Sequence, residues 1–211
     1  MNFKVNIKTT VKKIALTLIV MAFLISTSAQ LPAAKEIASK MRVGWNMGNT
    51  MEAICGETVW GGAITTQRFI DSVKAAGFNA VRIPCAWFCH SDTVTSEIDA
   101  DWLERVKEVV DYCINDDLYV VLNIHWDKGW LENRVNAANQ DIVNERQEKY
   151  WTQIAEYFID YDEHLLFAGA NEPNVENAAQ MSILMGYYQT FIDAVRATGG
   201  NNSSRTLIIQ G

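Results

Sequence analysis

The stretch Leu118–His125, "LYVVLNIH", is a short, nearly continuous apolar run that lies between two longer amphipathic segments. Those segments, near Asp99–Asn115 and Asp141–Asp160, place apolar residues at a spacing of about 3.6 and are expected to be helices. A strand that is covered on both faces has such an uninterrupted apolar run, whereas a half-exposed strand alternates. A strand between two helices is typical of a parallel sheet with crossover connections.

The same alternation extends in both directions along the chain. Further helices are expected near Thr65–Ala76 and Asn177–Ala197. Trp102 and Trp151 lie on apolar helical stripes and are expected in the core. The other expected strands are "MRVGWNM" (41–47), "NAVRIP" (79–84), "HLLFAGA" (164–170) and "RTLIIQG" (205–211). The sequence therefore predicts an α/β fold with five parallel strands and four connecting helices.

The number of strand and helix units leaves two architectures open. A closed barrel of eight such units typically needs about 250 residues. The chain has 211 residues and shows only five strand runs, the last of which ends at Gly211. The pattern fits either a small five-stranded α/β sheet or the first part of a barrel.

Residues 1–29 have the layout of a secretory signal peptide. Lys4, Lys8, Lys12 and Lys13 precede the apolar run Ile14–Ile25, which is followed by small polar residues. We predict cleavage after Ala29, a mature domain over 30–211, and no membrane span after cleavage. A span needs roughly 20 apolar residues; a membrane anchor or a buried first helix are the alternatives. The expected location is secreted, periplasmic or on the cell surface.

The remaining chain is acidic. Loss of residues 1–29 removes four of the 18 basic residues and none of the 25 acidic ones, which leaves a net charge of −11. Nucleic acids bind cationic surfaces, so they are not expected partners.

Four cysteines, Cys55, Cys85, Cys89 and Cys113, remain in that chain. They allow three disulfide pairings, and the sequence does not choose among them. Cys113 lies on an apolar helical stripe and is expected to be a buried, structural residue. The three histidines are not spaced from the cysteines as a zinc site would need.

Four successive strand runs end in polar or aromatic residues, where parallel α/β folds bind ligands. Alternation along the fourth run, in "FAGANEPN" (167–174), places Ala168, Ala170 and Glu172 on one face. An acid in such a partly apolar site would have a raised pKa and could act as a general acid. The alternative is a carboxylate at the start of a helix, after a strand that Pro173 merely ends.

Arg82 and His125 are the other charged or titratable residues at these strand ends. Arg82 is flanked by apolar residues, so it needs a buried carboxylate or a carbonyl as partner; a structural ion pair is the alternative. A lone histidine such as His125 is often a satisfied core residue. The dense aromatic residues nearby, Trp126 and Trp130, favour a binding role, because exposed rings can stack on sugars. Similar positions are occupied by Trp45, Trp60 and Trp87.

Four segments carry a resemblance to a known family. They are "GWNMGNT" (44–50), "GFNAVRIPCAW" (77–87), "YVVLNIHWD" (119–127) and "LLFAGANEPN" (165–174). In this order the chain resembles glycoside hydrolase family 5, the cellulase-type (β/α)8 TIM barrels, over most of residues 41–211. The resemblance implies retaining, endo-acting hydrolysis of β-1,4 bonds in a β-glucan, with no metal or other cofactor. Cellulose, mixed-linkage glucan and xyloglucan are the expected substrates, and mannan is a further possibility within the family.

The resemblance also assigns roles. It makes Glu172 the general acid/base and Asn171 the residue that bonds the sugar 2-hydroxyl. Arg82 and His125 would support the carboxylates and the sugar, together with Asn46, Trp45 and Trp126 as substrate-binding or supporting residues. Where many relatives have a second histidine, this chain has Trp126.

The family's nucleophilic glutamate follows the seventh strand, whereas this sequence stops after the fifth. Four loop acids, Glu52, Glu57, Asp127 and Glu132, are interpreted as solvated charges or sugar contacts rather than substitutes. We therefore expect the chain alone to be inactive or weakly active. The rival hypotheses are a non-catalytic carbohydrate-binding or half-barrel assembly protein, and a metal-dependent hydrolase that uses His125 and Asp127.

Overall fold

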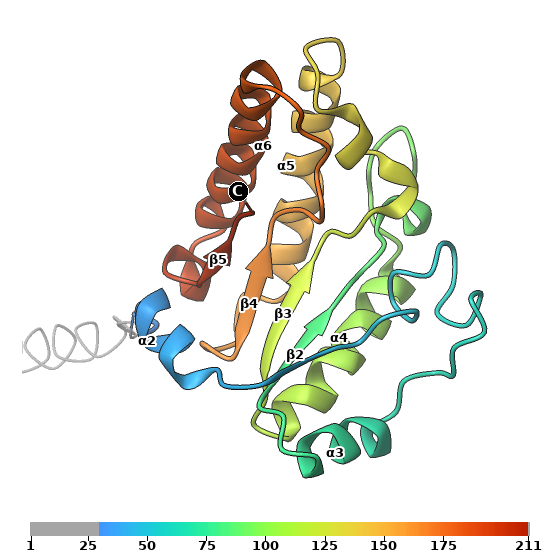
Figure 1. Ribbon diagram of the computed structural model, residues 1–211, viewed down its shortest axis with the longest axis vertical. Coiled ribbons are helices and arrows are strands. Elements are labelled where there is room, and N and C mark those ends of the chain that lie inside the picture. The colour runs from blue at the N-terminus through green and yellow to red at the C-terminus, as the bar shows by residue number, and fades with distance from the viewer. Residues whose placement is uncertain (1–29, 211) are drawn as a thin grey trace, which may run out of the picture.

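The computed structural model describes residues 30–210, and the predicted signal peptide lies outside them. Its centre is a parallel sheet of five strands in the order β1-β2-β3-β4-β5 (Figure 1). Each strand falls within one of the five expected runs, so this prediction is confirmed. The strands are β1 Gly44–Asn46, β2 Ala80–Ile83, β3 Tyr119–Asn123, β4 Leu165–Ala168 and β5 Leu207–Ile208.

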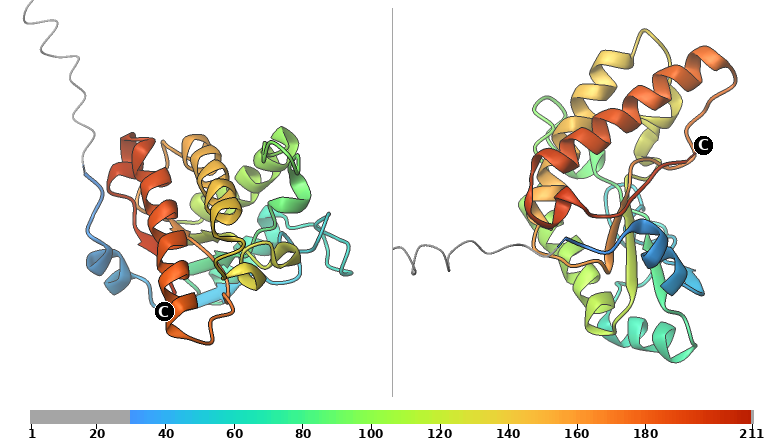
Figure 2. Two further views of the ribbon diagram at one scale, coloured as in Figure 1. Left: turned by 90° about the horizontal axis from the view of Figure 1, so that it is seen from above. Right: turned by 90° about the vertical axis from the view of Figure 1, so that its left-hand side faces the viewer.

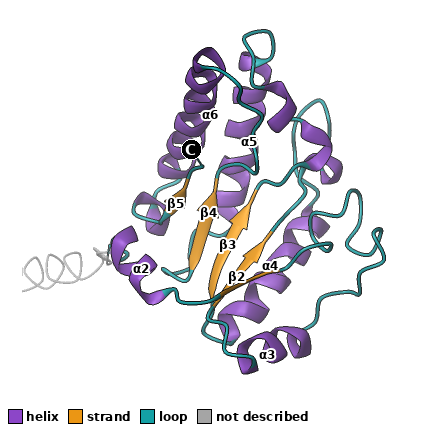
Figure 3. Cartoon of the chain, in the orientation of Figure 1, coloured by secondary structure: helices purple, strands orange, loops and turns teal. Residues whose placement is uncertain are grey.

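Four long helices connect successive strands, as the apolar stripes predict (Figure 3). They are α3 Gln67–Ala75, α4 Ala100–Asn115, α5 Gln140–Tyr157 and α6 Ala178–Ala197. Two of them begin at side-chain caps: Thr66 accepts a hydrogen bond from the Phe69 N–H, and Asn177 accepts one from the Gln180 N–H. The described residues also include short 3-10 helices, η1 Phe88–His90, η2 Asp127–Gly129, η3 Glu132–Arg134 and η4 Gly200–Ser203.

The helices α4, α5 and α6 lie side by side on one face of the sheet (Figure 2). Trp151 of α5 is fully buried there, with its ring centroid 5.3 Å from that of Phe167 and 4.5 Å from that of Phe191. Trp102 of α4 is 7% exposed and donates its indole N–H to the Ala86 carbonyl at 2.8 Å. The expectation that both tryptophans belong to the core is confirmed.

The opposite face of the sheet has a separate, smaller core. Ala80, Tyr119 and Leu166 come from three neighbouring strands and pack against Ile37 of α2 (Ala34–Lys40). The sequence pattern did not indicate this helix, which precedes β1 and lies against the amino ends of the strands in Figure 1. Because α2 covers that end, the polar residues after the strands lie at the uncovered end.

One disulfide bond links the loops that follow β1 and β2. It joins Cys55 to Cys89, with a Cα–Cα distance of 5.2 Å. Cys85 and Cys113 are free and buried, as expected for Cys113. The pairing depends on the contact between two loops, and no spacing in the sequence indicates that contact.

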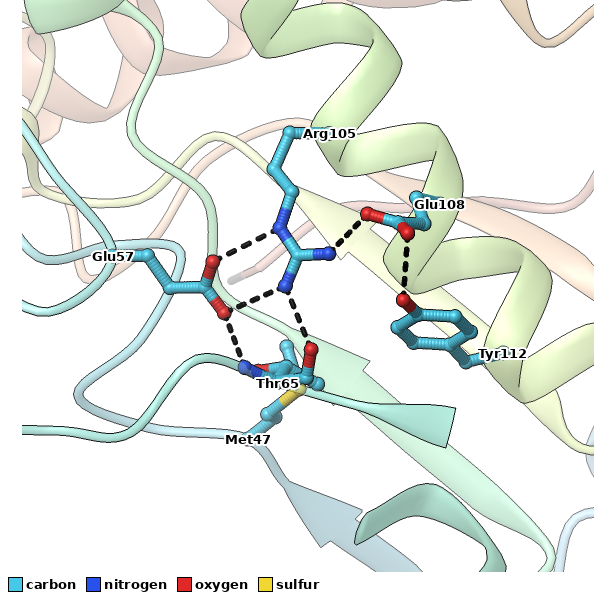
Figure 4. A network of polar contacts seen from close by, with 6 residues as sticks. All are labelled: Met47, Glu57, Thr65, Arg105, Glu108 and Tyr112. Carbon is cyan, nitrogen blue, oxygen red and sulfur yellow. Dashed lines mark hydrogen bonds and ion pairs between the residues drawn. The ribbon is translucent and has the colours of Figure 1, made fainter. Parts of the chain in front are cut away.

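The loop between β1 and α3 is also attached to α4 (Figure 4). Arg105 donates to both carboxylate oxygens of Glu57, at 2.9 and 3.0 Å, and to the Thr65 carbonyl at 2.8 Å. The Thr65 N–H donates to Glu57 at 2.6 Å. Burial opposes the ionisation of Glu57, but these hydrogen bonds outweigh it and hold the pKa of the Glu57 carboxyl below its usual value. Glu57 is therefore a structural residue.

Replacing Glu57 by glutamine is expected to lower the free energy of unfolding at neutral pH by about 1–3 kcal/mol, because Arg105 loses a largely buried charged acceptor. The contribution of a depressed carboxyl pKa is present above the unfolded pKa and disappears as pH falls through the folded one. The difference between the two proteins in urea unfolding should therefore shrink as the pH falls below the ordinary pKa of glutamate, about 4.3. As a control, Glu108→Gln removes the exposed ion pair with Arg105 and should lower the free energy of unfolding by less than about 0.5 kcal/mol. Equal losses in the two variants would contradict the structural role of Glu57.

Candidate active site

Arg82 joins the ends of three strands. Its Nη1 donates to Asn46 Oδ1 at 2.7 Å, and its Nη2 donates to Asn171 Oδ1 at 2.5 Å. The parallel register pairs Asn46 with Arg82 directly, while Asn171 follows β4. The carbonyl partners predicted for Arg82 are thus the side-chain amides of Asn46 and Asn171. These three predicted site residues form one cluster.

These bonds orient the Asn171 side chain. A guanidinium group only donates, so the amide oxygen of Asn171 must face Arg82. The side-chain NH2 of Asn171 is then left to donate to another acceptor. Asn171 is 6% exposed, which restricts that acceptor to a group entering over the strand end.

Glu172 follows this cluster in an unusual backbone conformation. Its φ is +45°, a region that residues other than glycine rarely adopt. Its N–H donates to Gln210 Oε1 at 3.0 Å. The side chain is exposed and borders a surface pocket of about 490 Å³, with Pro173, Val175, Met181, Leu184 and Gln210.

The prediction that Ala168, Ala170 and Glu172 lie on one face of the fourth strand is wrong at Ala170. β4 ends at Ala168, and Ala170 packs into the core on the helix side of the sheet. The chain turns at Gly169, where any Cβ would lie 2.6 Å from the ring of Phe191. Glu172 is therefore placed by a turn rather than by strand alternation, and within residues 30–210 it is exposed instead of enclosed by apolar residues.

The charges of the cluster act on one another. Burial lowers the pKa of Arg82, and the nearby carboxylates of Glu52 and Glu172 oppose that effect. Arg82 thus provides a positive charge beside Glu172, within the same strand-end cluster.

His125 is uncharged at neutral pH. Burial lowers the pKa of its imidazole to about 4, and the charge of Arg82 adds to this effect. Its Nδ1 lies 3.3 Å from Asn123 Nδ2. Because Asn123 Nδ2 can only donate, Nδ1 accepts and Nε2 carries the proton, which leaves His125 a hydrogen-bond donor at Nε2.

The predicted ring residues divide into two groups. Trp126, which follows His125, is 41% exposed and available for stacking. Trp45 is 39% exposed but lies on the other face of β1 from Asn46, with its ring edge-on to Phe78 at 5.5 Å. The structure therefore does not bring Trp45 to the Arg82 cluster.

Three further tryptophans occupy loops, and two of them are core residues. Trp87 is fully buried and donates its indole N–H to the Asn123 carbonyl at 3.0 Å. Trp130 is 2% exposed and packs edge-on against Tyr150. Only Trp60, at 48% exposed, remains a candidate ring among these three.

The other loop acids are buried rather than solvated, so that interpretation was wrong. Both carboxylate oxygens of Glu52 accept backbone N–H groups, from Asn49 at 2.6 Å and Thr50 at 3.0 Å. Asp127 accepts the N–H groups of Trp87, at 2.7 Å, and Phe88. Glu132 is 1% exposed. The hydrogen bonds by which Glu52 and Asp127 fix loop backbones were not visible in a sequence that shows only loop positions.

Gln210 was not predicted as a site residue, although it too follows an apolar strand run and its side chain accepts the backbone N–H of Glu172.

A metal site at His125 and Asp127 receives no support. The group of three ligand-type side chains found within residues 30–210 is Asp162, Glu163 and His164, before β4. No helix in that part of the chain is both apolar and long enough to cross a membrane.

The carboxyl end of this parallel sheet thus carries an arginine, two amides, a histidine and a carboxylic acid, at the edge where parallel α/β folds bind their ligands. The chain belongs to the cellulase family, glycosyl hydrolase family 5, which matches residues 38–211. The prediction of a TIM barrel family fold is thereby confirmed.

Individual relatives agree with this assignment. The chain is 40% identical over 186 residues to endoglucanase B of Clostridium cellulovorans, covering 83% of this chain and 42% of that protein. It is 40% identical over 193 residues to a xyloglucan-specific endo-β-1,4-glucanase of Bacteroides ovatus, covering 83% and 38%. The chain thus spans about two fifths of the length of these curated relatives.

Solved structures show the same partial coverage. A xyloglucan-specific β-1,4-glucanase from a ruminal metagenomic library superposes with a TM-score of 0.79 at 50% identity, covering 85% of this chain and 52% of that one. A broad-specificity endoglucanase from Clostridium longisporum gives 0.80 at 39% identity, covering 85% and 57%.

Proposed function

We propose that this chain carries the acid/base half of a retaining endo-β-1,4-glucanase, with Glu172 as the general acid/base. The observation that supports this most is the Arg82 bridge between Asn46 and Asn171, directly beside Glu172. The free NH2 of Asn171 is suited to donate to a sugar hydroxyl.

The reaction needs two carboxyl groups about 5–5.5 Å apart. Glu172 would protonate the glycosidic oxygen while the second carboxylate attacks the anomeric carbon, and would then take a proton from the water that hydrolyses the glycosyl-enzyme. Within residues 30–210 the loop acids Glu52, Glu57 and Asp127 already accept backbone or arginine hydrogen bonds, and Glu132 is enclosed. We therefore place the nucleophile outside the described residues.

The substrate proposed is a β-1,4-glucan backbone, with xyloglucan and cellulose as the first polymers to test. Relatives described as xyloglucan-specific and as broad-specificity endoglucanases support this choice. Trp126 offers an exposed ring next to His125 on which a glucose unit could stack. We also propose that the protein works outside the cytoplasm, because the disulfide between Cys55 and Cys89 fits an oxidising compartment.

The test compares the chain alone with a completed barrel. Residues 30–211 are fused to the helix that follows the fifth strand and the last three strand-helix units of the Clostridium longisporum endoglucanase. Release of reducing ends from xyloglucan is measured for both proteins. We expect turnover only from the fusion. The two parts of the relative, rejoined at the same position, serve as the control for the junction. Ordinary enzymatic rates from the 211-residue chain alone would contradict the missing nucleophile, whereas a folded fusion that binds xyloglucan without cleaving it would favour a binding protein.

A further inference from the structure

Glu132 is an enclosed acid in η3, in the loop between β3 and α5. Its side chain is 1% exposed, and neither carboxyl oxygen has a hydrogen-bond partner among the described residues. An ionised carboxylate in such a position costs several kcal/mol, so the group keeps its proton. Burial accordingly raises the pKa of the Glu132 carboxyl to about 9.

Two titratable groups interact electrostatically with Glu132. Asp127 comes from the same loop and Tyr188 from α6. Burial also raises the pKa of Asp127, but the N–H groups of Trp87 and Phe88 oppose this effect. Glu132 receives no comparable donation: the N–H groups of Glu132 itself, Leu131 and Asn171 lie near its carboxyl group without reaching hydrogen-bonding geometry. Of the two acids, Asp127 therefore has the better-stabilised carboxylate, and Glu132 is the one that keeps its proton at neutral pH.

The loop of Glu132 is bonded to the segment that carries Glu172. The carbonyl of Glu132 accepts the N–H of Asn174 at 3.0 Å. The side-chain oxygen of Asn133 accepts from the side-chain nitrogen of Asn174 at 2.5 Å. The loop therefore touches the segment on both sides of Glu172, at Asn174 through these bonds and at Asn171 through the enclosed carboxyl group.

The backbone conformation of the segment Asn171–Asn174 depends on contacts with other parts of the chain. Glu172 has a left-handed φ that strains a residue with a side chain. Its N–H is bonded to Gln210, whose own N–H donates to the Tyr188 hydroxyl at 3.3 Å. The charge of Glu132 also acts on the Tyr188 hydroxyl, so the enclosed acid is electrostatically coupled to a group that holds Gln210 in place.

We propose that Glu132 is a positioning residue for Glu172: as an enclosed, uncharged acid it keeps its loop packed against the segment Asn171–Asn174, and ionisation of Glu132 releases that segment. The importance of this positioning for catalysis rests on the proposed function of Glu172 as the acid/base. Opening of the segment Asn171–Asn174 is a property of the fold, and it is measured without an activity assay.

The pH dependence follows from linkage. When the segment opens, Glu132 meets water and its pKa returns to about 4.3, the ordinary value for glutamate. Between that value and about 9 the closed form binds one proton more than the open form. A rise in pH over this range therefore favours opening, by about tenfold per pH unit, and the effect levels off near pH 9.

Hydrogen exchange followed by NMR on the full chain tests the proposal. The protection factor of the Asn174 amide should fall about tenfold per pH unit from about pH 6 to about pH 9. In Glu132→Gln, which has the same shape and no charge, the protection should not change with pH. Glu176→Gln, an exposed acid in the following turn, should behave like the wild type.

Three outcomes would overturn the proposal. The first is a wild-type protection factor of the Asn174 amide that does not depend on pH. The second is an equal pH dependence of that protection factor in Glu132→Gln. The third is the same pH dependence for the Val121 amide in β3, which would mean that Glu132 supports the whole fold. The 13C shift of the Glu132 carboxyl in the unsubstituted chain is an independent measurement. A carboxyl already ionised at about pH 7 would also refute the proposal, even if Glu132→Gln does not fold. Failure of the glucanase assignment would leave all these exchange results unchanged.

Discussion

In the completed barrel, Glu172→Gln is expected to lower the turnover of xyloglucan by about 10²- to 10⁴-fold. Glutamine keeps the shape of the side chain but cannot give a proton to the leaving oxygen or take one from water. The contacts that Arg82 makes with Asn46 and Asn171 do not involve the Glu172 side chain, so the site should stay assembled. Because Glu172 is exposed, the melting temperature should not change.

Substrates with different leaving groups distinguish a loss of acid catalysis from other causes of a lower turnover. An aryl β-glycoside with a good leaving group needs little protonation, so its bond cleavage should lose much less than that of the polysaccharide. Glu176→Gln changes an exposed acid of the next turn and should leave turnover within about twofold of the parent. A Glu172→Gln barrel with unreduced turnover of xyloglucan would remove the acid/base assignment.

Replacing Arg205 by methionine is expected to lower the free energy of unfolding by about 3–5 kcal/mol. Arg205 precedes β5, is fully buried, and lies over the ring of Phe167 at 5.1 Å. All five of its N–H donors are used. They bond to the side chain of Asn202 and to the carbonyls of Phe158, Tyr161, Asp162 and Leu165.

Methionine fills much of the same space but takes one donor from each of these acceptors. The carbonyls of Phe158, Tyr161 and Asp162 keep a second donor, from the Tyr161 N–H, the Asn201 side-chain NH2 and the Leu165 N–H. The loss is therefore smaller than five unpaired acceptors would give, at about 1–3 kcal/mol for each buried acceptor that loses its partner. Burial lowers the pKa of Arg205 to about 10, so the side chain is still charged at neutral pH. Urea unfolding followed by circular dichroism measures the loss. Arg68→Met, at an exposed position of α3, should stay within about 0.5 kcal/mol. A loss below about 1 kcal/mol for Arg205→Met would show that water replaces the bonds.

Local patterns predicted the elements of this protein well. Apolar runs such as Leu118–His125 are strands because a parallel strand buries both of its faces, and that requirement is visible in consecutive residues. The stripes that include Trp102 and Trp151 are equally local. The buried flanks of Arg82 predicted a carbonyl or carboxylate partner, which follows from the cost of an unpaired charge.

Features that depend on contacts between distant segments were missed or misread. The helix α2 has a single buried residue, Ile37, so no apolar stripe marks it. Alternation failed at Ala170 because the ring of Phe191, from a helix later in the chain, leaves room only for a glycine at 169. Glu132 was read as a loop charge because the segment that is bonded to its loop, at Asn174, lies far from it in the sequence.

The sequence by itself determined the order of strands and helices and the residue types at the strand ends, because burial of a strand or of a helical stripe acts on neighbouring or regularly spaced residues. The tertiary structure alone decided which of those residues meet. Arg82 joins Asn46 and Asn171, Cys55 pairs with Cys89, and the Glu172 backbone is held by Gln210. Such pairs form only after parallel packing aligns segments tens of residues apart, and the cost of an unpaired buried polar group then selects the partner that each one takes.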